Sequence, residues 1–156
     1  MIALRTLIVL LLLGLSGSAV MAQCDDTLLD EPADKLGKFV YLRDFKARLK
    51  KGKKGKLAPQ LTYSVILNKG TAYRFIMNSA DGFNGTIVMD LFDRRGKLIS
   101  SYNSSADKHY EVIDMLCKQT GVHQIALSFT EGQEGCGVVV LGFQQRSGSN
   151  VENYLK

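Results

Sequence analysis

Apolar and polar side chains alternate along most of the chain beyond residue 60, and this pattern restricts the fold more than any other feature of the sequence. A period of two is typical of β-strands that bury one face. Turn-forming residues separate the alternating runs, as in Asn68-Lys69-Gly70 and Asp93-Arg94-Arg95-Gly96. The pattern predicts strands at residues 61–67, 71–77, 86–92, 97–102, 110–117, 122–130 and 136–143.

The segment 39–49 is less regular but also favours a strand. One face would carry apolar side chains interrupted by Arg43, namely Phe39, Tyr41, Phe45, Ala47 and Leu49. The spacing of Leu42, Phe45 and Leu49 also suits a helix, so both interpretations stay open. With this segment the chain has about eight short strands and no long helix.

A chain of 156 residues is long enough for one domain with its own core. An antiparallel sheet with one apolar face buries that face against a second layer. We therefore predict an all-β fold, an antiparallel β-sandwich over residues 39–145. An acidic leader at 23–38 would precede it, and a flexible tail at 146–156, rich in serine and glycine, would follow it.

Residues 1–22 have the pattern of a secretory signal peptide. Arg5 precedes an apolar run from Leu7 to Leu15, and small or modest side chains at Val20 and Ala22 favour cleavage before Gln23. Because a membrane-spanning helix needs roughly 20 apolar residues, the run is too short to cross a bilayer. We predict a secreted, periplasmic or outer-surface protein without a transmembrane anchor in its mature chain. A retained anchor and a lipoprotein acylated at Cys24 remain alternatives.

Positive charge is concentrated between Lys35 and Lys56, where ten basic residues stand against the single acid Asp44, a local balance of +9. Such a cluster attracts anionic polymers or lipid head groups. The candidate binding residues are the cations at its carboxyl end: Arg48, Lys50, Lys51, Lys53, Lys54 and Lys56. No aromatic residue lies between Phe45 and Tyr63, which makes nucleic acid an unlikely partner because single strands are bound by base stacking. An anionic polysaccharide or envelope surface fits better. A solvated loop, partnered with the acidic leader, is the other interpretation.

Three cysteines in an exported chain allow one disulfide and leave one thiol. Cys117 and Cys136 would lie at opposite ends of a strand about 25 Å long. A disulfide needs Cα atoms within about 7 Å, so this pairing is disfavoured. The sequence predicts a bridge from Cys24 to either Cys117 or Cys136, and three unbridged cysteines remain an alternative.

No catalytic residue, metal site or cofactor is expected. Cys136 is flanked by glycines that would expose a nucleophile, but neither His109 nor His123 stands in a recognisable catalytic signature. Cysteines and histidines lack zinc spacing. Four residues could offer oxygen ligands to calcium: Asp81, Asn84, Asp90 and Asp93. They do not form the twelve-residue acidic loop that is typical of a calcium site. A small thiol enzyme or hydrolase is the least favoured alternative.

The runs LNKGTAYRF, TIVMDLFDRRGKLISSY and HYEVIDMLCKQTGVHQIALSF resemble the bacterial pre-peptidase C-terminal domain and its small secreted relatives. The resemblance covers roughly residues 61–143. It implies a jelly-roll-like β-sandwich that is commonly appended to secreted enzymes and is not itself catalytic. The chain departs from the pattern at His123, where the Thr-Gly-x-Tyr corner has tyrosine, and in carrying no enzyme beside the domain.

Together these features predict an exported, non-catalytic β-sandwich of the bacterial envelope or exterior that acts as a binding module. The alternative is a structural or assembly component held by protein partners through its sheet faces or edges.

Overall fold

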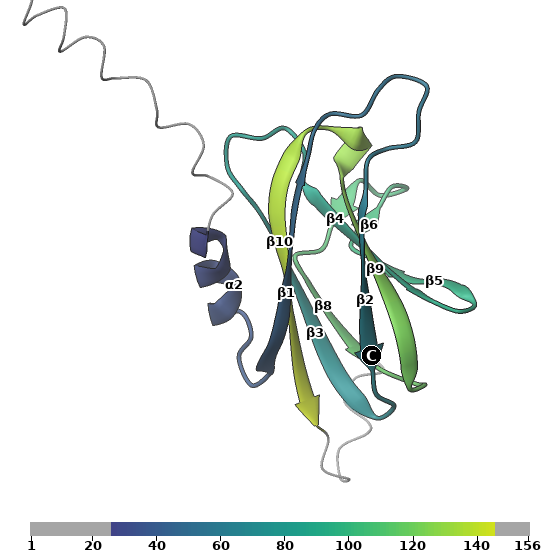
Figure 1. Cartoon of the computed structure of the whole chain (residues 1–156). Helices are drawn as coiled ribbons and strands as arrows, with labels where there is room; N and C mark the ends of the chain where they lie inside the picture. The colour runs from purple at the N-terminus through teal and green to yellow at the C-terminus, as the bar shows by residue number, and fades with distance from the viewer. Residues whose placement is uncertain (1–25, 146–156) are drawn as a thin grey trace, which may run out of the picture.

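Two antiparallel sheets packed face to face make up the body of the protein (Figure 1). The computed structural model describes residues 26–145. The signal peptide with its cleavage site before Gln23, Cys24 with its acylation, and the tail 146–156 lie outside the described residues, and these predictions stay predictions. Within residues 26–145, no helix is long and apolar enough to cross a membrane.

The first sheet, sheet A, has the strand order β1 (Val40–Leu49), β10 (Gly135–Gln145), β3 (Thr71–Ser79), β8 (Val112–Leu116). The second, sheet B, has the order β2 (Leu61–Leu67), β9 (Gly121–Phe129), β4 (Ile87–Asp93), β5 (Gly96–Ser100). A small ribbon pairs β6 (Tyr102–Asn103) with β7 (Lys108–His109). The described chain also has three short helical segments: η1 (Asp26–Leu29), α2 (Asp30–Asp34) and η2 (Thr130–Gly132).

The connectivity of these strands is that of a jelly roll. When the eight strands of the two sheets are numbered consecutively along the chain, sheet A reads 1-8-3-6 and sheet B reads 2-7-4-5. Every neighbouring pair is antiparallel. The predicted all-β antiparallel sandwich is therefore confirmed.

The core lies between the inner faces of the two sheets and follows the alternation read from the sequence. Sheet A contributes Phe45, Phe75 and Leu141, all fully buried, and sheet B contributes Met89 and Leu127. Burying one such side chain contributes about 1.5–3 kcal/mol to the free energy of unfolding. Since most strands supply several of these groups, contact between the sheets is the main source of stability.

Strand β1 departs from the predicted face pattern. Phe45 and Ala47 point into the core as expected, but Phe39 packs on the opposite, outer side of sheet A. The pairing of β1 with β10 shifts register between Tyr41 and Arg43. A bulge of this kind reverses the facing of the residues beyond it, which a uniform period of two does not anticipate.

The acidic leader packs on the outer face of sheet A, on the side away from sheet B (Figure 1). There a second apolar cluster joins Leu36 of the leader, and Phe39 directly after the leader, to strand residues Ile76, Val138 and Val140. Gly142 of β10 lies directly beneath, and a Cβ at this position would come within 2.5 Å of the Leu36 side chain. The leader is thus an integral layer of the structure from η1 onward.

Arg74 holds the leader to the sheet from the middle of β3. Its guanidinium makes two parallel hydrogen bonds to the carboxylate of Asp114 on β8, each 2.7 Å long. Its remaining nitrogen, Nη1, donates to the carbonyl oxygens of Lys35, at 3.1 Å, and Leu36, at 3.4 Å. The guanidinium also lies 4.4 Å from the centre of the Phe39 ring. One side chain thereby joins two strands and the end of the leader helix.

Arg74→Lys should lower the free energy of unfolding by about 2 kcal/mol, because an ammonium group cannot reproduce the paired hydrogen bonds and stack on the ring at once. Both partners are less than a third exposed, at 23% for Arg74 and 29% for Asp114. Urea unfolding measures the change, and a double-mutant cycle with Asp114→Asn isolates the coupling. Arg48→Lys, on an exposed side chain, is the matched control. An equal loss of stability in the two variants would contradict the role of Arg74 in holding the leader to the sheet.

Candidate functional site

The predicted cationic residues lie together at one end of the sandwich (Figure 1). Arg48 is the penultimate residue of β1, and the five lysines follow in the β1–β2 loop, residues 50–60, which we call the Lys loop. All six side chains are exposed. Within residues 26–145, the structure gives them no side-chain hydrogen bond or ion pair, so their charges face solvent.

The Lys loop is held at its base and turns tightly at its tip. The backbone N–H of Gly52 donates to the carbonyl of Gly132 in η2, at 2.8 Å, and the N–H of Lys56 donates to the carbonyl of Lys53, at 3.1 Å. Gly55 supplies the positive φ that the turn requires, +77°. The loop therefore displays its lysines from a defined position.

A hollow of about 430 Å³ is lined by the Lys loop and by η2. Its lining includes the backbone and side chains of residues 51–56 on one side and Glu131 on the other. Glu131 is the acidic residue in this lining, so the hollow carries a large excess of positive charge. The lysines of the hollow attract an anionic ligand strongly at low ionic strength. Salt weakens this attraction, because the Debye length falls to about 8 Å at 0.15 M.

The acidic leader does not neutralise the Lys loop in the described structure. Glu31 instead pairs with Lys35 one helical turn later, at 2.8 Å, and Lys35 also pairs with Glu111, at 3.0 Å. The hydrogen bonds that Lys35 donates to Glu31 and Glu111 raise the pKa of Lys35 above its ordinary value of 10.5. Sequence proximity suggested a contact between leader and loop, but the leader lies on the outer face of sheet A.

Cys117 and Cys136 have different states. Cys117 is a free, buried thiol whose Sγ donates to the carbonyl of Gln119, at 3.1 Å. Cys136 is fully buried and disulfide-bonded, so it offers no thiol for nucleophilic chemistry. Pairing of Cys24 with Cys117 is therefore not formed, and the disfavoured bridge between Cys117 and Cys136 is not formed either. Cys24 lies outside the described residues.

We predict that the partner of Cys136 is Cys24, because the sequence holds three cysteines and Cys117 is free. Peptide mapping of the non-reduced protein by mass spectrometry should find a linked pair of peptides containing Cys24 and Cys136. A peptide with acylated Cys24 would contradict the prediction, because an acylated sulfur cannot form the bridge. Cys117 should react with a thiol reagent only after unfolding, which gives the internal control.

The histidines and acids form no metal centre: within residues 26–145, no group of three or more metal-ligating side chains comes together. Asp90 pairs with Lys97 at 2.6 Å, and Asp93 caps its own turn, whereas Asp81 and Asn84 lie in the loop before β4. His109 stacks on Tyr102, with ring centres 4.5 Å apart. His123 is buried and hydrogen-bonds the backbone: its Nδ1 lies 3.0 Å from the carbonyl oxygen of Gly121.

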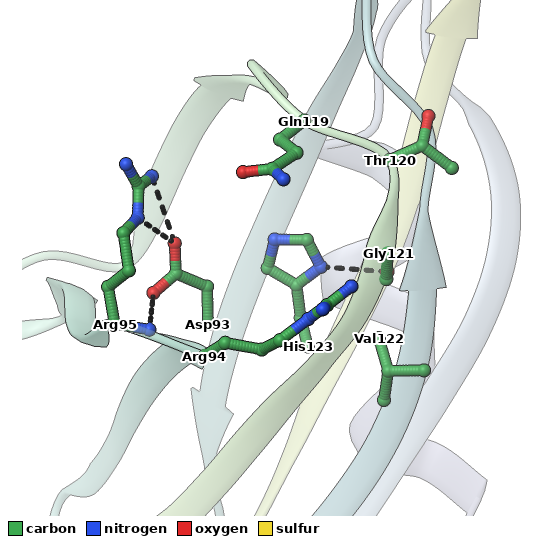
Figure 2. A pocket seen from close by; sticks show the side chains of 8 residues that line it. All are labelled: Asp93, Arg94, Arg95, Gln119, Thr120, Gly121, Val122 and His123. Carbon is green, nitrogen blue, oxygen red and sulfur yellow. Dashed lines mark hydrogen bonds and ion pairs between the residues drawn. The ribbon is translucent and has the colours of Figure 1, made fainter.

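A second polar site, which the sequence did not reveal, lies at the opposite end of the sandwich, between the β4–β5 turn and the β8–β9 loop (Figure 2). The pocket has a volume of about 220 Å³. Its lining includes Asp93, Arg94, Arg95, Gln119 and His123. The sequence showed Asp93-Arg94-Arg95-Gly96 as a turn, and two adjacent arginines in it were the only available signal.

Hydrogen bonds within the turn distribute its charges unequally. The backbone N–H of Arg95 donates to Asp93 at 2.7 Å and is the largest cause that lowers the pKa of Asp93 below its ordinary value of 3.8. The guanidinium of Arg95 also pairs with this carboxylate, at 3.1 Å. Arg94 makes no such contact within residues 26–145, so its positive charge remains available at the pocket.

Comparison with known proteins returns no match, either to a family model or to a curated protein.

Proposed function

We propose that this chain is an exported bacterial β-sandwich, related to the pre-peptidase C-terminal domains, that binds an anionic glycan of the envelope or exterior through its Lys loop and has no catalytic activity. Export is supported by the signal-like residues 1–22 and by the disulfide at Cys136, since such bonds persist in oxidising compartments. The jelly-roll order is the architecture that the family resemblance implies.

The observation that carries the proposal is a group of six exposed, unpaired cations: Arg48 near the end of β1, and five lysines on a loop whose base is fixed by the hydrogen bond from Gly52 to Gly132. An anchored loop loses less conformational entropy on binding than a free tail with the same charges. The lysines act as separate, mobile charges that suit a polymer with repeated anionic groups. The loop contains no aromatic side chain for base stacking, which favours a glycan over nucleic acid.

Replacing Lys50, Lys51, Lys53, Lys54 and Lys56 by Gln should weaken binding to heparin, used as a sulfated glycan probe, by at least about 100-fold at 50 mM salt. Each lysine near an anionic surface is worth about 1 kcal/mol, and these contributions fall with ionic strength. Elution salt from a heparin column and titration calorimetry measure the effect. The control has the same change in net charge at five exposed lysines outside the loop: Lys38, Lys46, Lys69, Lys108 and Lys118. Equal losses in both variants would refute a specific role for the loop.

Glu131→Gln should strengthen heparin binding about two- to fivefold, because it removes the acidic side chain from the lining of the hollow beside the Lys loop. The effect should vanish in 1 M salt, where the Debye length is about 3 Å. Glu134→Gln, an exposed acid in the same connection but outside this lining, is the matched control. Unchanged or weaker binding by the Glu131 variant would show that the hollow does not take part.

An anionic lipid surface is a second candidate ligand, favoured by Leu57. This side chain is 96% exposed and directly follows the last lysine, so it would insert an apolar group beside the bound head groups. Sedimentation with phosphatidylglycerol vesicles separates the two candidates. Leu57→Ser should reduce vesicle binding and leave heparin binding unchanged if lipid is a true ligand.

An assembly role is favoured by edge strand β1, where Val40, Tyr41 and Leu42 are exposed. An edge strand with exposed apolar groups pairs readily with a partner chain. Under this alternative, a fixed protein partner co-purifies with the variant that lacks the five loop lysines as well as with the natural protein. If the variant loses both heparin binding and the protein partner, the partner is instead held to this protein through the glycan.

A further inference from the structure

The pocket in Figure 2 is continuous with a second hollow of different character, and together they have an amphiphilic lining. Both hollows share Asp93, Arg95, Gln119 and His123. The second has a volume of about 300 Å³ and extends between the edge strands β5 and β8. Its remaining lining is mainly apolar, with Leu98, Ile99, Met115, Leu116 and Cys117, and it also includes Lys118.

We propose that these two hollows form one binding site for a small amphiphilic carboxylate, such as a medium-chain fatty acid. The carboxylate would lie against Arg94 in the polar hollow, and the alkyl chain would lie in the apolar hollow between β5 and β8. The site is at the end of the sandwich opposite the Lys loop and does not rest on the proposed glycan function.

Charge selects the head group. Figure 2 shows Arg94 extending across the pocket towards Gly121, whereas Arg95 is turned to Asp93. With Arg95 neutralised by that pair, Arg94 leaves the polar hollow with an excess positive charge. A planar guanidinium binds a carboxylate through two parallel hydrogen bonds. The side-chain amide of Gln119, in the same lining, is a further donor.

Gly121 leaves the space for this head group. It lies on β9 two residues before His123 and therefore faces the same side, the inside of the sandwich. A Cβ built on Gly121 meets nothing nearer than the Arg94 Nη2, at 4.0 Å. The backbone here would accept a side chain, and its absence opens the pocket.

The apolar hollow exists because β5 is irregular. Its pairing with β4 shifts register between Leu91 and Phe92, so that Leu91 faces Ile99, Phe92 faces Lys97, and Leu98 has no partner in β4. Leu98 is 43% exposed and lines the hollow. On the other side of the opening, β8 supplies Met115 and Leu116. These groups remain partly open to water, and an alkyl chain would cover them.

Titration calorimetry with acetate, hexanoate, octanoate and octylammonium tests the proposal on the purified full protein. We expect no measurable binding of acetate, about fourfold tighter binding for each buried methylene from hexanoate to octanoate, and no binding of octylammonium, whose charge Arg94 repels. Equal binding of octanoate and octylammonium would overturn the role of Arg94. A lack of octanoate binding would overturn the site itself.

Three substitutions locate the site. Arg94→Gln should weaken octanoate binding at least tenfold, and Arg48→Gln at the other end should leave it unchanged. Gly121→Leu should abolish binding by filling the polar hollow. Leu98→Ser should weaken binding several-fold, with Leu57→Ser as its control, because both leucines are exposed and neither change empties the core. If the Arg94 and Gly121 variants bind octanoate as tightly as the natural protein does, the proposed location of the site is refuted.

A site-specific readout comes from the imidazole rings, since the sequence contains two histidines. Octanoate should shift the ring resonances of His123 and leave those of His109, which lies outside both hollows, unchanged. The variant lacking the five loop lysines should bind octanoate normally. If it does not, the fatty acid binds at the Lys loop and the proposal fails, whereas failure of heparin binding alone leaves this site standing.

Discussion

Strand β10 is apolar on both faces, and the arrangement of the other layers depends on this property. Val139 and Leu141 face sheet B, whereas Val138 and Val140 face the leader, and all four are fully buried or nearly so. A strand of this kind is stable only when it is flanked by strands and covered on each side. Sheet B covers one face and the residues before β1 cover the other, with Arg74 fastening that second cover through its hydrogen bonds.

Much of this fold could be predicted from residue patterns, because burial in a sandwich imposes a period of two. The alternation correctly predicted strands in the segments that form β3, β4 and β9, whose inward residues include Phe75, Met89 and Ile125. The cover formed by the leader was not predicted, because the pattern placed Phe39 on the apolar face of the following strand and the charged residues of the leader indicated no buried face. The bulge at Tyr41 and Arg43 depends on pairing with a strand nearly a hundred residues away, which no local pattern contains.

The two candidate sites also differ in how far they could be predicted from the sequence. The cations of the Lys loop are consecutive in sequence, so their density alone predicted where positive charge would gather. The pocket beside Arg94 unites the β4–β5 turn with the β8–β9 loop and β9, and its shape depends on the missing side chain at Gly121 and on the irregular register of β5. Sites assembled from distant segments require tertiary structure before their chemistry can be recognised. The cysteines are an intermediate case. The expected length of a strand disfavoured a Cys117–Cys136 bridge, and Cys117 is a free thiol in the structure.

The pairing of β1 with β10 joins the first strand of the sandwich to the last. Sheet A therefore cannot be completed until residues near 145 are available, and the leader has no finished surface to rest on before then. Placing β10 beside β1 requires closing a loop almost as long as the domain. Such long-range closure slows folding. The topology thus keeps the polypeptide unfolded for longer than a chain whose neighbouring strands are adjacent in sequence.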